Sequence, residues 1–133
     1  AGTSTYLKNK FKKIESYSVE PYGYDDTKQS LNSSQILANE QGHYSICDAI
    51  LTPEPGKITF PINLQNLKNG LVVSDDEVKS SIKFFAEHLK IIIEPGGAVA
   101  ATAALTKKID LKNKNVVVMI SGGNIDLDMF ANL

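Results

Sequence analysis

The feature that most constrains the fold is the run of five apolar residues at positions 116–120, VVVMI, which leads directly into Ser-Gly-Gly-Asn. A continuous apolar run of this length is typical of a strand covered on both faces, as in a parallel sheet flanked by helices. In open α/β sheets, ligands bind beyond the carboxyl ends of such strands. The two glycines allow a sharp turn and a close backbone approach to a flat ligand. The alternative interpretation is a tight turn before a C-terminal helix, with Ser121 and Asn124 as caps.

Helix-like and strand-like segments alternate along the rest of the chain. Apolar spacing predicts helices at 5–13, at 59–67 and from a Ser-x-x-Glu capping box at 74–77 to residue 89, with short strands at 16–19 and 71–73. The polar stretch 23–39 predicts a loop with a helical turn at 27–31, and the alanine-rich stretch 98–106 predicts close packing against its neighbours. This alternation indicates an α/β fold with a parallel sheet.

The composition excludes several classes of function. The chain has 133 residues and a net charge of −1, so a basic nucleic-acid-binding face is not expected, and no apolar run approaches membrane-spanning length. All 14 basic residues are lysines, so an anion site must use lysines, backbone N–H groups, hydroxyls or amides rather than an arginine fork. The single cysteine, Cys47, excludes an internal disulfide and is typical of a reducing compartment, so we expect a cytoplasmic protein.

Several acidic residues are candidates for a site. Glu20, Asp25 and Asp26 lie in one loop around Pro-Tyr-Gly-Tyr, and a Glu and an Asp six residues apart are able to converge on Mg²⁺ or Ca²⁺. The alternative is a solvated acidic loop. Glu94, before Pro-Gly-Gly, is either a buried acid at a helix start or only a favourable charge on the helix dipole.

Other reactive side chains give weaker patterns. Lys83 comes directly after Ser-Ile, which superficially resembles a Ser-x-Lys nucleophile motif, but an amphipathic helix at this place favours a surface lysine. His43 and His88 have no second ligand at metal-binding spacing, and neither is given a role. Cys47 is interpreted as a small buried residue rather than a nucleophile.

Five short motifs succeed one another along the chain: VEP at 19–21, DD at 25–26, VSDDEV at 73–78, EPGGA at 94–98 and SGGNID at 121–126. This ordered set resembles the C-terminal part of the pyridoxal-phosphate-dependent threonine/serine dehydratases and of serine racemase. The stretches SICDA at 45–49 and PGKITF at 55–60 resemble bacterial threonine dehydratases in particular. The resemblance covers residues 1–133 and implies a three-layer α/β fold. Its open, mainly parallel sheet, flanked by helices, would form the C-terminal portion of a fold-type II enzyme.

The resemblance also implies that this chain lacks part of the active site. In the family, the Schiff-base lysine and the glycine-rich phosphate loop lie in a larger N-terminal portion, and Ala1-Gly2-Thr3 is similar to the residues immediately after that loop. None of the 14 lysines stands in the Schiff-base context. We therefore expect no catalytic residue here and an inactive isolated chain. The expected partner is the N-terminal portion of the same enzyme or a complementing chain, within a homodimer or tetramer.

The cofactor residues implied by the resemblance cluster near the end of the chain. Ser121 matches the serine whose hydroxyl meets the pyridine nitrogen of pyridoxal phosphate, with Gly122 giving clearance. A hydroxyl is too weak an acid to keep that nitrogen protonated, which favours β-elimination of water over transamination. Glu94 matches an acid near the cofactor ring, and Asn124 lies where racemases contact a nucleotide effector.

The metal ligands implied by the resemblance lie in the acidic loop. Glu20 and Asp26 match divalent-metal carboxylates of the family, and the Tyr24 carbonyl matches a third ligand. The expected cation is Mg²⁺ or Ca²⁺.

The activity implied by the resemblance is the deamination of threonine to 2-oxobutanoate and ammonia, as in isoleucine biosynthesis, with serine as a second substrate. Within the family, serine racemase or hydroxyaspartate dehydratase is the alternative. A different alternative is a non-catalytic chain, either a truncated product or a subunit that needs a partner to supply the lysine.

Overall fold

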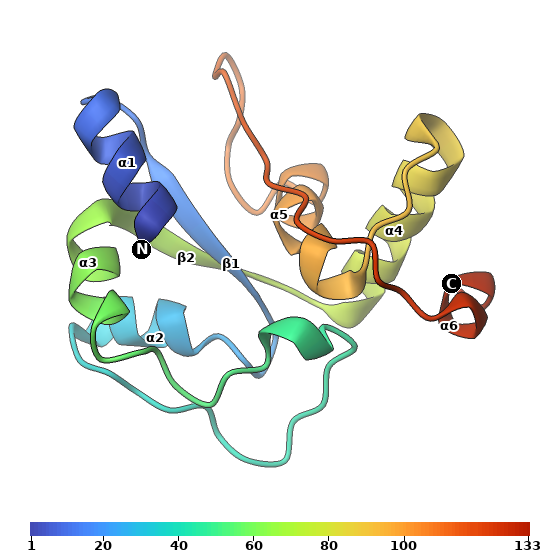
Figure 1. Ribbon diagram of the computed structural model, residues 1–133, viewed down its shortest axis with the longest axis horizontal. Helices are drawn as coiled ribbons and strands as arrows, with labels where there is room; N and C mark the ends of the chain where they lie inside the picture. Colours follow the sequence, from blue (N-terminus) through green and yellow to red (C-terminus); the bar gives the residue numbers. More distant parts are fainter.

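Two parallel strands, β1 (Ser16–Pro21) and β2 (Leu67–Val73), form the sheet, with Val19 opposite Leu71 and Glu20 opposite Val72. The computed structural model describes residues 1–133 (Figure 1). The helices are α1 (Gly2–Lys10), α2 (Asp26–Ser33), the 3₁₀ helix η1 (Asp48–Ile50), α3 (Thr59–Asn66), α4 (Asp75–Leu89), α5 (Pro95–Leu105) and α6 (Leu127–Ala131). None of these helices has the length and apolar character needed to cross a membrane.

Most of the predicted elements form near the predicted positions. The first helix begins and ends about three residues earlier than expected, whereas β1 runs two residues further, to Pro21, and β2 begins four residues earlier, at Leu67. The helical turn expected at 27–31 is part of α2. The capping box of α4 is confirmed, since the Ser74 hydroxyl accepts from the Glu77 N–H and the Glu77 carboxylate accepts from the Ser74 N–H.

The core lies mainly between α4, α5 and the ends of the strands. Val78, Ile82 and Phe85 are the buried apolar residues of α4, and they pack with the alanines of α5 and with Val73 at the end of β2. Ala98 has no exposed surface, which confirms the close packing expected of the alanine-rich stretch. Because alanine has only a methyl side chain, α5 is able to approach its neighbours more closely than a leucine-rich helix.

The strand predicted at residues 116–120 is wrong for this chain, since the segment has no regular secondary structure. None of its backbone N–H groups donates to a backbone carbonyl. Val117 is 88% exposed and Met119 63% exposed. A strand needs a neighbouring strand along its hydrogen-bonding edge, and β1 and β2 pair with each other instead.

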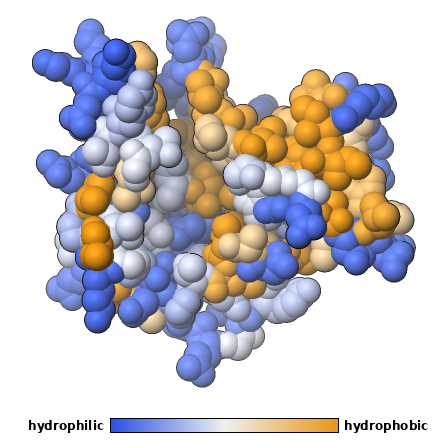
Figure 2. Space-filling view, in the orientation of Figure 1, coloured by the Kyte–Doolittle hydropathy of each residue, from blue (hydrophilic) through white to orange (hydrophobic).

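The exposed apolar surface extends beyond this segment. Leu89, Ile91 and Ile92, at and after the end of α4, are also exposed. The space-filling view shows apolar surface on the side of the molecule that holds α4 and α5 (Figure 2). Large contiguous apolar patches of this kind are typical of interfaces rather than of free surfaces.

Candidate functional site

The first turn of α5 is where the predicted cofactor residues meet. Glu94 is the N-cap residue with an extended backbone, and Pro95 comes next at the first helical position, where its missing N–H costs nothing. Gly96 and Gly97 complete the turn, and both are buried. The turn therefore presents the positive end of an eleven-residue helix dipole.

The two glycines of this turn contact two different segments. A Cβ on Gly96 would lie 3.4 Å from the Ala49 Cβ, so η1 packs on one side of the turn. A Cβ on Gly97 would lie 2.9 Å from the Gly122 nitrogen, so Gly122 also packs against this turn. A side chain at Gly97 would thus meet the Gly122 backbone, whereas the contacts at Gly96 are ordinary van der Waals distances.

Glu94 joins the helix start to the second of these segments. Its backbone N–H donates to the Gly122 carbonyl at 3.0 Å, and its carboxylate accepts from the Asn124 N–H at 3.0 Å. A Cβ on Gly122 would lie 2.5 Å from the Glu94 carboxylate oxygens, and one on Gly123 would lie 2.9 Å from the Ile92 carbonyl. The close approach expected of these glycines therefore exists, and within this chain the groups approached are Glu94 and Ile92.

The side chains of Ser121 and Asn124 remain available to a ligand. Both residues are exposed, and neither the Ser121 hydroxyl nor the Asn124 amide has a hydrogen-bond partner in this chain. All four predicted cofactor residues thus fall together, with Gly122 and Asn124 bonded to Glu94 and the polar side chains of Ser121 and Asn124 free. This arrangement fits the hydrogen-bonding groups that a pyridine ring nitrogen and its substituents require.

The acidic loop lies at the end of β1, apart from the first turn of α5. The two carboxylate oxygens of Glu20 accept from the Thr27 N–H at 2.8 Å and the Lys28 N–H at 2.9 Å, in the first turn of α2. Burial raises the pKa of Glu20, although these hydrogen bonds oppose the shift, and the nearby Asp26 charge adds to it. Glu20 therefore satisfies backbone groups of a helix start at a considerable desolvation cost.

Asp26 is also desolvated. It is 2% exposed and accepts from the Asn39 amide at 2.8 Å, and burial raises the pKa of its carboxyl. The hydroxyl of Tyr24 donates to the His43 carbonyl at 2.9 Å. Asp26 is therefore shielded from solvent, and Glu20 is partly so. No three His, Cys, Asp or Glu side chains converge, so a cation here would also need carbonyl oxygens or water.

The remaining reactive side chains lie outside both places. Cys47 has no exposed surface, and burial raises the pKa of its thiol to about 11, which confirms the interpretation as a buried residue. Lys83 is exposed, as expected of a surface lysine. The His88 ring stacks on Phe84 at 4.4 Å between centroids.

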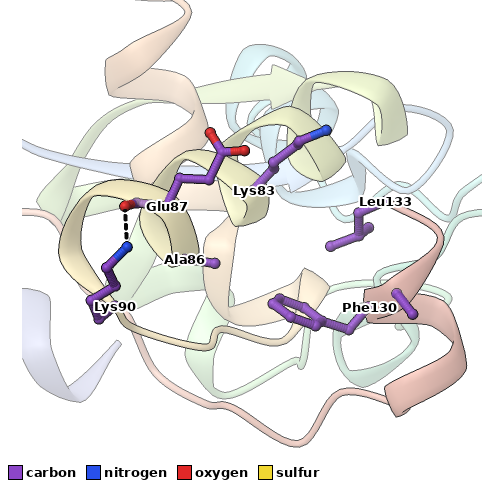
Figure 3. Close-up of a pocket in the computed structure, with 7 residues that line it drawn as sticks. Lys83, Ala86, Glu87, Lys90, Phe130 and Leu133 are labelled. Carbon is purple, nitrogen blue, oxygen red and sulfur yellow. Dashed lines mark hydrogen bonds between the residues drawn. The ribbon is translucent and has the colours of Figure 1, made fainter.

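A groove between α4 and α6 holds none of the predicted site residues. It has a volume of about 400 Å³ and is lined by Lys83, Lys90 and Phe130, among others (Figure 3). The Lys90 ammonium is already engaged, since it donates to the Glu87 carbonyl at 2.7 Å.

Comparison with known proteins defines the class of this protein. The family model described as pyridoxal-phosphate dependent enzyme matches residues 1–122, and the chain belongs to this family. The α/β fold is that of the fold-type II members.

The relatives that it matches act on small amino acids. Serine racemase of Dictyostelium discoideum is 37% identical over 136 residues, which cover 100% of this chain and 42% of the racemase. L-threo-3-hydroxyaspartate ammonia-lyase of Saccharomyces cerevisiae is 35% identical over 117 residues, covering 88% of this chain and 36% of the lyase. The crystal structure of a T.th. threonine deaminase superposes with a TM-score of 0.88 at 29% identity, covering 95% of this chain and 46% of the deaminase. This chain therefore spans less than half the length of each of these relatives.

The sequence did not reveal two features of the site. Ala49 and Gly122 pack against adjacent glycines of the same helix turn, although they are far apart in the chain. The carboxylate of Asp75 binds the segment just before η1, and nothing in the sequence except the capping-box motif singles this residue out. The Gly-Gly pair at 96–97 was the one available sign that two segments pack against this turn.

Proposed function

We propose that the whole protein is a pyridoxal-phosphate-dependent ammonia-lyase that converts threonine into 2-oxobutanoate and ammonia, with serine as a second substrate. The observation that carries this proposal is the free hydroxyl of Ser121 on a segment fixed by Glu94, in a chain of this family. When bound, pyridoxal phosphate supplies an electron-withdrawing ring that stabilises negative charge at the substrate α-carbon.

The residues of this chain would hold and tune that ring. The Ser121 hydroxyl would donate a hydrogen bond to the ring nitrogen. Gly122 and Asn124 would be kept in place by their hydrogen bonds with Glu94. Because a hydroxyl is a weak acid, it would leave the nitrogen without a proton, which favours loss of the β-hydroxyl over transamination. The lysine that binds the cofactor and moves the α-proton would come from a portion of the polypeptide that this chain does not contain.

Two related activities are the second candidate. Serine racemase and hydroxyaspartate ammonia-lyase are 37% and 35% identical to this chain, against 29% for the threonine deaminase structure. The substrates named for all three relatives are β-hydroxy-α-amino acids, so each offers the same leaving group. The test is product analysis of the whole protein with threonine, serine and 3-hydroxyaspartate, including chiral separation of serine. Slower turnover of threonine than of either other substrate would refute the first choice.

A non-catalytic chain is the remaining alternative, favoured by the fact that this chain spans less than half of each relative. Under our proposal, the 133-residue chain mixed with pyridoxal phosphate forms no Schiff-base absorbance band. A borohydride-reducible adduct on one lysine, together with dehydratase activity, would contradict this. Activity that returns on mixing with a lysine-bearing portion would identify a complementing subunit.

We also propose that Mg²⁺ or Ca²⁺ binds at Glu20 and Asp26, with the Tyr24 carbonyl as a third ligand. The support is that two desolvated carboxylates with raised pKa values lie near each other, a state that a cation would stabilise. The test compares melting temperatures in EDTA and in either cation. The cation should raise the melting temperature of wild type and of Asp25→Asn, but not of Asp26→Asn. Equal shifts in the two variants would refute the site.

The proposed assembly of the whole protein rests on the family resemblance, and its proposed location rests on the single cysteine. We propose a homodimer or tetramer in the cytoplasm, consistent with a single buried thiol that forms no disulfide.

A further inference from the structure

The connection between α2 and α3 is anchored at one point to the start of α4. The Asp75 carboxylate accepts from the Ser45 hydroxyl at 2.7 Å and from the Ile46 N–H at 3.0 Å. The Ser45 hydroxyl in turn accepts from the Cys47 N–H at 3.2 Å. Asp75 is the first residue of α4, where the helix dipole favours a negative charge. One carboxylate thus fixes three consecutive residues of a long connection.

This anchor is linked directly to the first turn of α5. Cys47 is buried in the core, and η1 begins at the next residue. Within η1, Ala49 lies 3.4 Å from where a Cβ of Gly96 would be, and Ile50 lies at 3.6 Å. Figure 1 shows η1 as the short teal-green helix beside the start of α5. The position of η1 therefore depends on bonds made three or four residues earlier in the chain.

Ala49 is exposed, although Ser45 and Cys47 just before it are buried. It packs against Gly96, whereas Gly122, the neighbour of Ser121, packs against Gly97. η1 therefore packs on the same helix turn that binds the segment carrying the proposed cofactor residues. Cys47 lies in the core and Ile46 and Ile50 pack against it, so these apolar contacts and the Asp75 bonds together place η1.

We infer that Asp75 is a positioning residue of the site: it holds residues 45–47 so that Ala49 stands against the first turn of α5. This inference rests on the proposed function. It predicts that loss of the Asp75 bonds impairs ligand binding at the site, although Asp75 itself touches no ligand.

The experiment compares Asp75→Asn in the whole protein with the matched control Asp76→Asn. Asp76 lies in the same helical turn, but its carboxylate is 94% exposed and only pairs loosely with Lys79. The readouts are KM and kcat for threonine, the dissociation constant of pyridoxal phosphate, the melting temperature, and the rate at which Cys47 is labelled by a thiol reagent.

Asp75→Asn should raise KM or the cofactor dissociation constant by about threefold or more, with a smaller change in kcat, and should speed labelling of Cys47. Ser45→Ala removes the Ser45–Asp75 bond and the bond from the Cys47 N–H but keeps the bond from the Ile46 N–H to Asp75. It should shift the same constants less and keep the protein folded if Asp75→Asn does not fold. Asp76→Asn should leave every value near wild type.

Two results would overturn the inference. One is a lower melting temperature in Asp75→Asn and in Ser45→Ala with unchanged binding constants, because the anchor would then be structural only. The other is unchanged labelling of Cys47 in both variants. Failure of the proposed function is seen separately in the wild-type protein, which would then bind no pyridoxal phosphate or would turn over threonine more slowly than serine or 3-hydroxyaspartate.

Discussion

Gly122 offers a direct test of how the site is packed. In Gly122→Ala the new methyl group would lie 2.5 Å from the Glu94 carboxylate oxygens, whereas ordinary contact begins at 3.4 Å. The carboxylate is the far end of a flexible side chain, so it is expected to rotate away rather than push the backbone. That rotation breaks its hydrogen bond from the Asn124 N–H. Because Glu94 is half-buried, the lost charge-assisted bond corresponds to about 1–2 kcal/mol of unfolding free energy.

The assay is urea denaturation of the whole protein at neutral pH, monitored by circular dichroism. Glu94→Ala removes both the clash and the hydrogen bond. Adding Gly122→Ala to this variant should therefore lower the unfolding free energy by no more than about 0.5 kcal/mol. Gly2→Ala is the matched control, since nothing lies within 4 Å of its Cβ position. Gly123→Ala should cost more than Gly122→Ala, because its methyl meets the Ile92 backbone carbonyl. An equal cost of Gly122→Ala with and without Glu94 would refute the reasoning.

Three further predictions concern single residues. Ser74→Ala should lower the unfolding free energy by about 1 kcal/mol through loss of the capping box, whereas Ser80→Ala, on the exposed face of α4, should change it little in the same urea assay. The raised pKa of Glu20 means that its folded form holds a proton more tightly, so its contribution to stability is full below the unfolded pKa and is lost as pH rises through the folded pKa. In EDTA, Glu20→Gln should therefore show a smaller fall in stability between mildly acidic and neutral pH, and a parallel pH profile would contradict this. The Cys47 thiol, with a pKa of about 11 and no exposed surface, should react with a thiol reagent at about pH 8 only on unfolding, and fast labelling of the native protein would contradict its burial.

Local signals in the sequence were enough for much of the fold. The capping box of α4 depends on Ser74 and Glu77, three residues apart, so its geometry is set by local spacing alone. The burial of Cys47 is likewise expected, because a free cysteine usually behaves as a small buried apolar residue. The strand expected at 116–120 failed because strand formation depends on a partner, and β1 pairs only with β2.

The site was predicted only in outline, because its bonds join distant parts of the chain. The positions of Glu94 and Ser121 came from a family resemblance, whereas the bonds that hold Glu94 to residues 122 and 124 are non-local. Asp75 and Ser45 are likewise 30 residues apart, so neither suggests the other. Propensity and spacing describe neighbours along the chain and carry no information on such pairs.

The unpaired segment at 116–120 affects the tendency of the polypeptide to aggregate while it folds and assembles. β-Branched residues whose backbone groups are unpaired and exposed promote sheet formation between copies of a chain. Lys112 and Lys114 stand just ahead of the segment, and both are exposed. The positive charges of these lysines repel the same lysines of a second chain aligned in register. Charged residues beside hydrophobic strands commonly oppose aggregation in this way. Neutralising both lysines should therefore speed aggregation during refolding while leaving the finished protein unchanged in stability.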